Sequence, residues 1–233
     1  YTKAEPLYVE ALNIRKKKLG TEHPDYATNL NNLAELYRSM GNYTKAEPLY
    51  VEALNIFKKI LGNEHPTYAV SLNNLATLYA NMGNYTKAEP LYIEALNIFK
   101  KILGTEHPDY ATNLNTLAEL YRSMGNYTKA EPLFVEALNI RKKILGTEHP
   151  VYAGNLNNLA ELYRSMGNYT KAEPLFIAAL NIDKKLLGED HPHYATDLNN
   201  LAALYSSMGN YTKAEPLYIE ALNIFKKILG TEH

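Results

Sequence analysis

The sequence of 233 residues contains no cysteine and no tryptophan, and its acidic and basic side chains nearly balance. Without cysteine, disulfides and thiol chemistry are excluded. A formal net charge of −1 provides no electrostatic attraction to nucleic acid or to an anionic membrane. No apolar run approaches the ~18 residues of a membrane span. Hydrophobic residues nevertheless make up 46% of the chain, enough to bury a large core.

The sequence is organised by internal repetition. One phrase, GNYTKAEPLY or GNYTKAEPLF, begins at five glycines spaced 42 residues apart: Gly41, Gly83, Gly125, Gly167 and Gly209. A fixed period of this length indicates stacked repeats, each too small to bury its own apolar face. We therefore expect one solenoid over 1–233 without linkers, with half a repeat at 1–23 and full repeats at 24–65, 66–107, 108–149, 150–191 and 192–233.

Each repeat contains two helical patterns. In residues 27–40 the apolar side chains follow a 3.6-residue period, and Pro24 suits the first helical position before them. A second pattern covers residues 43–61, with Asn42 as the N-cap and Gly62 as the stop. We call these the A helix and the B helix of the repeat. The predicted fold class is all-α.

The residues at fixed positions of the repeat resemble the tetratricopeptide repeat: Leu30-x-x-Leu33-Ala34-x-x-Tyr37, then Ala46-x-x-x-Tyr50 and Ala53. The 42-residue length and the LGTEHP connector are similar to the subtype found in kinesin light chains and in many bacterial repeat proteins. This resemblance implies a right-handed superhelical solenoid whose A helices line a concave groove. It also implies a cytoplasmic protein that binds a protein or peptide segment.

Almost nothing lies outside the repeat pattern from which an active site could be built. Only Gly154 among the glycines and His193 among the histidines depart from it. The other histidines form the EHP series: His23, His65, His107, His149, His191 and His233. Equivalent positions in stacked repeats lie ~10 Å apart, too far to share a zinc ion with ligands at ~2.1 Å. We therefore expect these histidines to brace the loops, and we predict no catalytic residue, no metal, no cofactor and no enzymatic activity.

Paired asparagines are the main candidates for a binding site on the A helix. The first member is Asn31, Asn73, Asn115, Asn157 or Asn199, and the second is Asn32, Asn74, Asn158 or Asn200, with Thr116 in the variant copy. Asparagine carries both a donor and an acceptor, so a column of them can hydrogen-bond a peptide backbone. Alternatively, one asparagine of each pair bonds the neighbouring repeat. We favour the ligand for the first position and leave both roles open for the second.

Charged residues of the A helix form a second set of candidates for the groove. Glutamate and arginine occur together, three residues apart, as Glu35 and Arg38, Glu119 and Arg122, and Glu161 and Arg164. Where the glutamate is absent the arginine is absent too, which predicts an ion pair on one helix face worth ~0.2–0.5 kcal/mol. A bound acidic ligand could recruit these arginines. Gly154 replaces a larger side chain and leaves extra room in the groove.

Two B-helix positions complete the expectations from the sequence. Phe57 and Phe99 stand where other copies have arginine or Asp183, so we expect a half-exposed position and a possible apolar patch. The invariant asparagines Asn13, Asn55, Asn97, Asn139, Asn181 and Asn223 suggest a ladder of hydrogen bonds between repeats.

Two functions remain open on the sequence alone. The first is a non-catalytic scaffold that binds a protein or peptide in the groove. The second is a structural spacer that associates with itself. The near-identical repeats favour a repetitive or backbone-defined ligand. Apolar residues of the first and last B helices, among them Tyr8 and Leu222, would drive weak head-to-tail association of copies.

Overall fold

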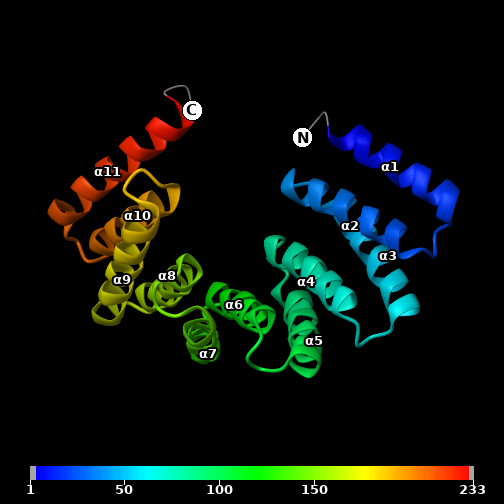
Figure 1. The fold of residues 1–233 in the computed structure, drawn as a ribbon, viewed down its shortest axis with the longest axis horizontal. Coiled ribbons are helices and arrows are strands. Elements are labelled where there is room, and N and C mark those ends of the chain that lie inside the picture. The colour runs from blue at the N-terminus through cyan, green and yellow to red at the C-terminus, as the bar shows by residue number, and fades with distance from the viewer. Residues whose placement is uncertain (1–3, 231–233) are drawn as a thin grey trace. The chain divides into compact units, whose positions relative to one another are not determined.

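The computed structural model describes residues 4–230, and this part of the chain is built from helices without a strand (Figure 1). It divides into two compact units, Tyr1–Gly104 and Thr105–His233. The first unit contains α1 (Ala4–Leu19), α2 (Pro24–Ser39), α3 (Tyr43–Leu61), α4 (Pro66–Asn81) and α5 (Tyr85–Leu103). The second contains α6 (Pro108–Ser123), α7 (Tyr127–Leu145), α8 (Pro150–Ser165), α9 (Tyr169–Leu187), α10 (Pro192–Ser207) and α11 (Tyr211–Leu229).

The all-α prediction is confirmed, with the even-numbered helices as A helices and the odd-numbered ones as B helices. The single array expected over the whole chain stays a prediction. The first three residues of the half repeat expected at 1–23 and the last EHP histidine, His233, lie outside the described residues.

Each A helix begins at the histidine and proline of the EHP segment. The Nδ1 of His65 accepts a hydrogen bond from the backbone N–H of Thr67 at 3.1 Å and so caps α4. Pro66 follows at the first helical position, where a missing N–H costs nothing. The same cap occurs at His23, His107, His149 and His191. The predicted structural role of these five histidines is confirmed.

Each full B helix begins at an asparagine, and its last turn is closed by a glycine. The Oδ1 of Asn42 accepts from the backbone N–H of Lys45 at 3.2 Å. At the other end Gly62 has φ 86° and ψ 169°, a conformation that is essentially restricted to glycine. Both ends agree with the sequence-based prediction because these signals are local.

Within each unit, the core lies between the A and B helices of each repeat and between successive repeats. Alanines with no exposed surface stand where the helices pack, for example Ala27 and Ala34 on α2 and Ala53 on α3. Their small side chains allow the backbones to approach closely, while the fully buried ring of Tyr50 fills the space beside them. Apolar residues remain exposed on the first and last B helices, including Tyr8 (38%) and Leu222 (51%). Association through these residues stays a prediction.

None of the helices described between residues 4 and 230 combines the length and the apolarity needed to cross a bilayer.

Candidate binding surface

The A helices of each unit pack directly beside one another. In the first unit α2 contacts α4, and in the second α8 contacts both α6 and α10. Within the first unit, α2 and α4 lie on one side and α3 and α5 on the other (Figure 1). We call the surface of the A helices that points away from the B helices the A-helix face. All candidate asparagines and Glu–Arg pairs belong to A helices.

In three of the pairs, the first asparagine connects one repeat to the next within a unit. The Nδ2 of Asn31 donates to the hydroxyl of Ser71 at 3.1 Å, and the Nδ2 of Asn157 donates to the Oδ1 of Asp197 at 2.6 Å. Asn115 donates in the same way to Asn155. Each partner lies on the following A helix. Asn73 and Asn199 are half-buried at the same position.

This arrangement corrects our preference for the first asparagine as the ligand-binding one. The Nδ2 groups of Asn31, Asn115 and Asn157 are occupied by the neighbouring repeat, and their Oδ1 atoms are buried. The cause is geometric. The first asparagine points sideways along the stack, toward the position 40 residues later, and not outward from the A-helix face.

The second asparagine of each pair is the one available to a ligand. Asn32 is exposed, and Asn74, Asn158 and Asn200 are half-buried. None of these four side chains has a hydrogen-bond partner among residues 4–230. In the variant copy the Thr116 hydroxyl instead donates to the backbone carbonyl of Thr112 at 3.0 Å. An unused amide is therefore present at this position in every full repeat except the variant one.

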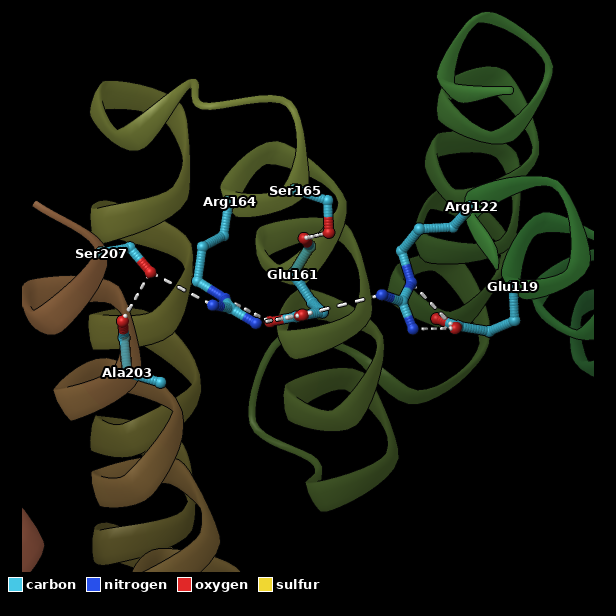
Figure 2. Close-up of polar contacts among 7 residues, drawn as sticks. All are labelled: Glu119, Arg122, Glu161, Arg164, Ser165, Ala203 and Ser207. Atoms are coloured by element: carbon cyan, nitrogen blue, oxygen red, sulfur yellow. Dashed lines mark hydrogen bonds and ion pairs between the residues drawn. The ribbon is translucent and has the colours of Figure 1, made fainter. Parts of the chain in front are cut away.

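The Glu–Arg pairs form as predicted, and in the second unit they are connected to each other (Figure 2). The Nη2 of Arg122 lies 2.7 Å from Glu119 within α6, while its Nη1 lies 3.6 Å from Oε1 of Glu161 on α8. Glu161 in turn accepts two hydrogen bonds from Arg164, at 2.8 and 2.6 Å. The Nη1 of Arg164 then donates to the Ser207 hydroxyl on α10 at 3.2 Å. We call this connected row the Glu–Arg network.

The pair in the first unit has a different second partner. The Nε of Arg38 donates to Glu35 at 2.8 Å, and the Tyr50 hydroxyl donates to the same carboxylate at 2.7 Å. The hydrogen bond from Arg38 is the main factor that lowers the pKa of Glu35, against the opposing effect of burial. In the next repeat Thr77 replaces the glutamate, and its hydroxyl lies 2.8 Å from that of Tyr92. These contacts anchor the A-helix face to the B helix beneath it.

The apolar patch predicted at Phe57 and Phe99 is wrong. Only 2% of Phe57 and 4% of Phe99 is exposed. Their position faces the space between successive repeats, where both rings join the core cluster of the first unit. The charged residues at the equivalent position are also withdrawn from solvent, since Asp183 is 3% exposed and Arg141 is half-buried. Variation between aromatic and charged residues therefore did not indicate exposure.

The invariant asparagines of the B helices do not form the expected ladder. Asn13, Asn55, Asn97, Asn139, Asn181 and Asn223 are all exposed, and none bonds another group in the described part of the chain. Asn55 lines a shallow cavity of about 480 Å³ with Pro48, Val51 and Lys59 on the outer surface of α3. This surface lies on B helices and is separate from the A-helix face.

Over residues 4–230, no group of three or more histidine or acidic side chains is arranged to hold a metal ion.

Comparison with known families identifies the repeat. The profile described as tetratricopeptide repeat matches residues 1–59, 29–80, 67–143, 114–164 and 151–227. The chain belongs to the tetratricopeptide repeat family. Such repeats generally mediate protein–protein interaction as scaffolds and are typically non-catalytic. No match was found among curated proteins.

Similar solved structures also consist of tetratricopeptide-like repeats. A putative kinesin light chain with nearly identical repeats, from Podosopora anserina, is 28% identical over 90% of this chain and 99% of its own, with a TM-score of 0.75. BtubC (BKLC) from P. vanneervenii is 27% identical over 99% of this chain and 92% of its own, with a TM-score of 0.78. The resemblance to kinesin-light-chain-like repeats is therefore confirmed.

A more distant structure shares the fold alone. A Rap protein complexed with competence and sporulation factor is 16% identical over 90% of this chain and 60% of its own, with a TM-score of 0.67.

Proposed function

We propose that this tetratricopeptide repeat chain is a non-catalytic scaffold that binds an extended protein or peptide segment on its A-helix face. The observation that carries the proposal is a pair of unused amides in each unit, Asn32 and Asn74 in the first and Asn158 and Asn200 in the second. A side-chain amide offers a donor and an acceptor together, which matches the C=O and N–H of a peptide backbone. Because the amide recurs at one repeat position, it favours a ligand recognised through its main chain.

The Glu–Arg network favours a ligand without strongly acidic groups. Each arginine of the Glu–Arg network already has a carboxylate partner, and Glu161 contacts both Arg122 and Arg164. An acidic ligand must break these contacts before it gains its own. A neutral backbone need not do so. The Glu–Arg network then keeps its ion pairs when the ligand binds to the free asparagines.

A peptide library displayed on phage, selected against the immobilised chain, tests this proposal. Peptides should be enriched, and the triple variant N74A/N158A/N200A should bind them at least about tenfold more weakly, because each lost hydrogen bond contributes ~0.5–1.5 kcal/mol. The matched control is N55A/N97A/N139A, which removes three exposed amides from B helices. This control should bind like the unmodified chain.

Two outcomes would contradict the proposal. If no peptide is enriched above background, the chain is better described as a structural spacer. If the B-helix control loses binding while N74A/N158A/N200A retains it, the ligand lies on the opposite surface. Circular dichroism of each variant verifies that helicity is unchanged.

A further inference from the structure

Four residues that depart from the repeat pattern gather around one cavity of the second unit. Gly154 of α8, Asp183 of α9, and His193 and Asp197 of α10 all line a cavity of about 250 Å³. Asn157, Asn158 and Asn200 complete its polar wall on the A-helix face. Equivalent residues in the other copies are mostly threonine, phenylalanine, arginine or asparagine. Copy-specific substitutions thus concentrate at one place.

Three buried oxygen atoms beside the cavity accept no hydrogen bond from the described residues. Asp183 and Asp197 are only 3% and 2% exposed. The Oδ1 of Asp183, the Oδ2 of Asp197 and the Oδ1 of Asn157 are buried and receive no hydrogen bond from residues 4–230. The ring of His193 lies beside them: its Nδ1 is 3.8 Å from the Oδ2 of Asp183, and its side chain is 62% exposed. Buried carboxylates that are only partly hydrogen-bonded are unfavourable unless a proton or a cation joins them.

The preceding repeat shows what fills the equivalent space. There Arg141 stands in the position of Asp183, and Thr112 stands in the position of Gly154. The Nη2 of Arg141 donates to the Thr112 hydroxyl, so a guanidinium from α7 reaches across to α6. In the first unit the buried ring of Phe57 occupies the corresponding position.

The second unit opens this space at its next repeat. Asp183 has a shorter side chain than arginine or phenylalanine, and Gly154 has none. A Cβ added at Gly154 would meet no atom within 4 Å. Where the preceding repeat holds the guanidinium of Arg141, this repeat therefore has an open, acidic pocket.

We propose that this pocket binds the guanidinium group of an arginine side chain carried by the segment on the A-helix face. A guanidinium has five N–H donors in one plane, enough for the two carboxyl groups and the Asn157 oxygen. It is also more weakly hydrated than an ammonium ion, so its burial costs less. That the arginine arrives on a bound segment rests on the proposed function. Recognition of the guanidinium itself does not.

Proton exchange should accompany binding. Burial raises the pKa of Asp197 to about 7 and raises that of Asp183 as well, and each carboxyl is within hydrogen-bonding reach of the other. The empty pocket therefore holds a proton near neutral pH, which a guanidinium would displace. The other titratable groups that face the two carboxyl groups are His191 and His193. Displacement of this proton predicts tighter binding at about pH 8 than at about pH 6.

Isothermal titration calorimetry of the whole chain with N-acetylarginine amide tests the proposal. We expect saturable binding at one site, a weaker response to the lysine analogue, and none to the uncharged citrulline analogue. The variant D183N/D197N should lose at least about tenfold in affinity, since hydrogen bonds to charged groups contribute ~1.5–3 kcal/mol. G154T should also weaken binding by refilling the space. The matched control D190N changes an exposed acid in the neighbouring loop and should have no effect.

Several results would overturn the guanidinium site. These are an absence of saturable binding, equal binding of the lysine analogue, binding that does not strengthen from pH 6 to pH 8, or full affinity in D183N/D197N. Circular dichroism separates loss of the pocket from loss of the fold. Because the probe is a single amino-acid derivative, it reports on the pocket even if peptide display enriches nothing. Enriched peptides combined with a probe that fails to bind would instead retain the proposed function and reject the pocket.

Discussion

Replacement of Asp197 by asparagine should make the protein more stable above neutral pH. Asp197 is 2% exposed, and burial is the main factor that raises its pKa from 3.8 to about 7. The folded chain therefore holds a proton that the unfolded chain has already released. Unfolding between about pH 4 and pH 7 releases this proton, so the free energy of unfolding decreases as pH rises through that window. Asparagine cannot ionise and removes this dependence.

The magnitude follows from the pKa difference. A change of about three pKa units, at about 1.4 kcal/mol per unit, corresponds to about 4 kcal/mol as an upper limit at pH 8. The packing should survive, because Asn155 occupies the equivalent position one repeat earlier. Its Nδ2 donates to the carbonyl of Val151 at 2.7 Å, and its Oδ1 accepts from Asn115. The same two bonds are available to D197N.

Urea unfolding followed by circular dichroism at about pH 5 and pH 8 measures the effect. The unmodified chain should be less stable at pH 8 than at pH 5. D197N should change less between the two values, with Asp183 still contributing, and should be more stable than the unmodified chain at pH 8. The matched control N155D places an aspartate at the equivalent position of the preceding repeat, where Arg141 stands in place of Asp183. The new aspartate should destabilise the protein at pH 8 less than Asp197 does. A parent protein of equal stability at both pH values, or a D197N variant that is less stable at pH 8, would refute the reasoning.

Three further substitutions test the contacts between and within repeats. N115A should lower the free energy of unfolding by ~1–3 kcal/mol, because the buried Oδ1 of Asn155 loses its donor; an unchanged urea midpoint would argue against its role in connecting repeats. E161Q should lower the free energy of unfolding by ~1 kcal/mol or less and should reduce the salt dependence of thermal unfolding, since the Glu–Arg network is partly exposed. A melting temperature equally sensitive to salt would contradict this. G62A should cost ~1–3 kcal/mol from backbone strain at φ 86°, and calorimetry showing no loss would count against the strained conformation.

Most of the fold could be predicted because its signals are local. Proline, asparagine and glycine mark the ends of the helices within a few residues of where they act, so the predicted B helix at 43–61 coincides with α3. The ion pair between Glu161 and Arg164 could also be predicted, since both residues lie on one turn of one helix. Neither inference required knowledge of how one repeat meets the next.

Contacts between repeats could not be assigned in this way. The choice between Asn31 and Asn32 depends on which side chain points along the stack, and that direction is set by the packing of α2 against α4. Burial of Phe57 was missed for the same reason. The acidic pocket was missed because Asp183 and Asp197 are brought together only by the packing of α9 and α10. A comparison of the copies, position by position, identifies Gly154, Asp183 and Asp197 as unusual but does not show that they lie together.

The connection through the first asparagine has a consequence for arrays of different length. Its partner, 40 residues later, is serine, asparagine or aspartate in the pairs observed, and each of these accepts the same N–H. Deleting or duplicating a whole 42-residue block would bring together two surfaces that already fit, so the chain could be shortened or lengthened by recombination without new contacts. The acidic pocket is the exception, because its walls come from two successive blocks. Insertion of a block between α9 and α10 would separate Asp183 from Asp197 and abolish the pocket, whereas a change in the number of earlier blocks would leave it intact.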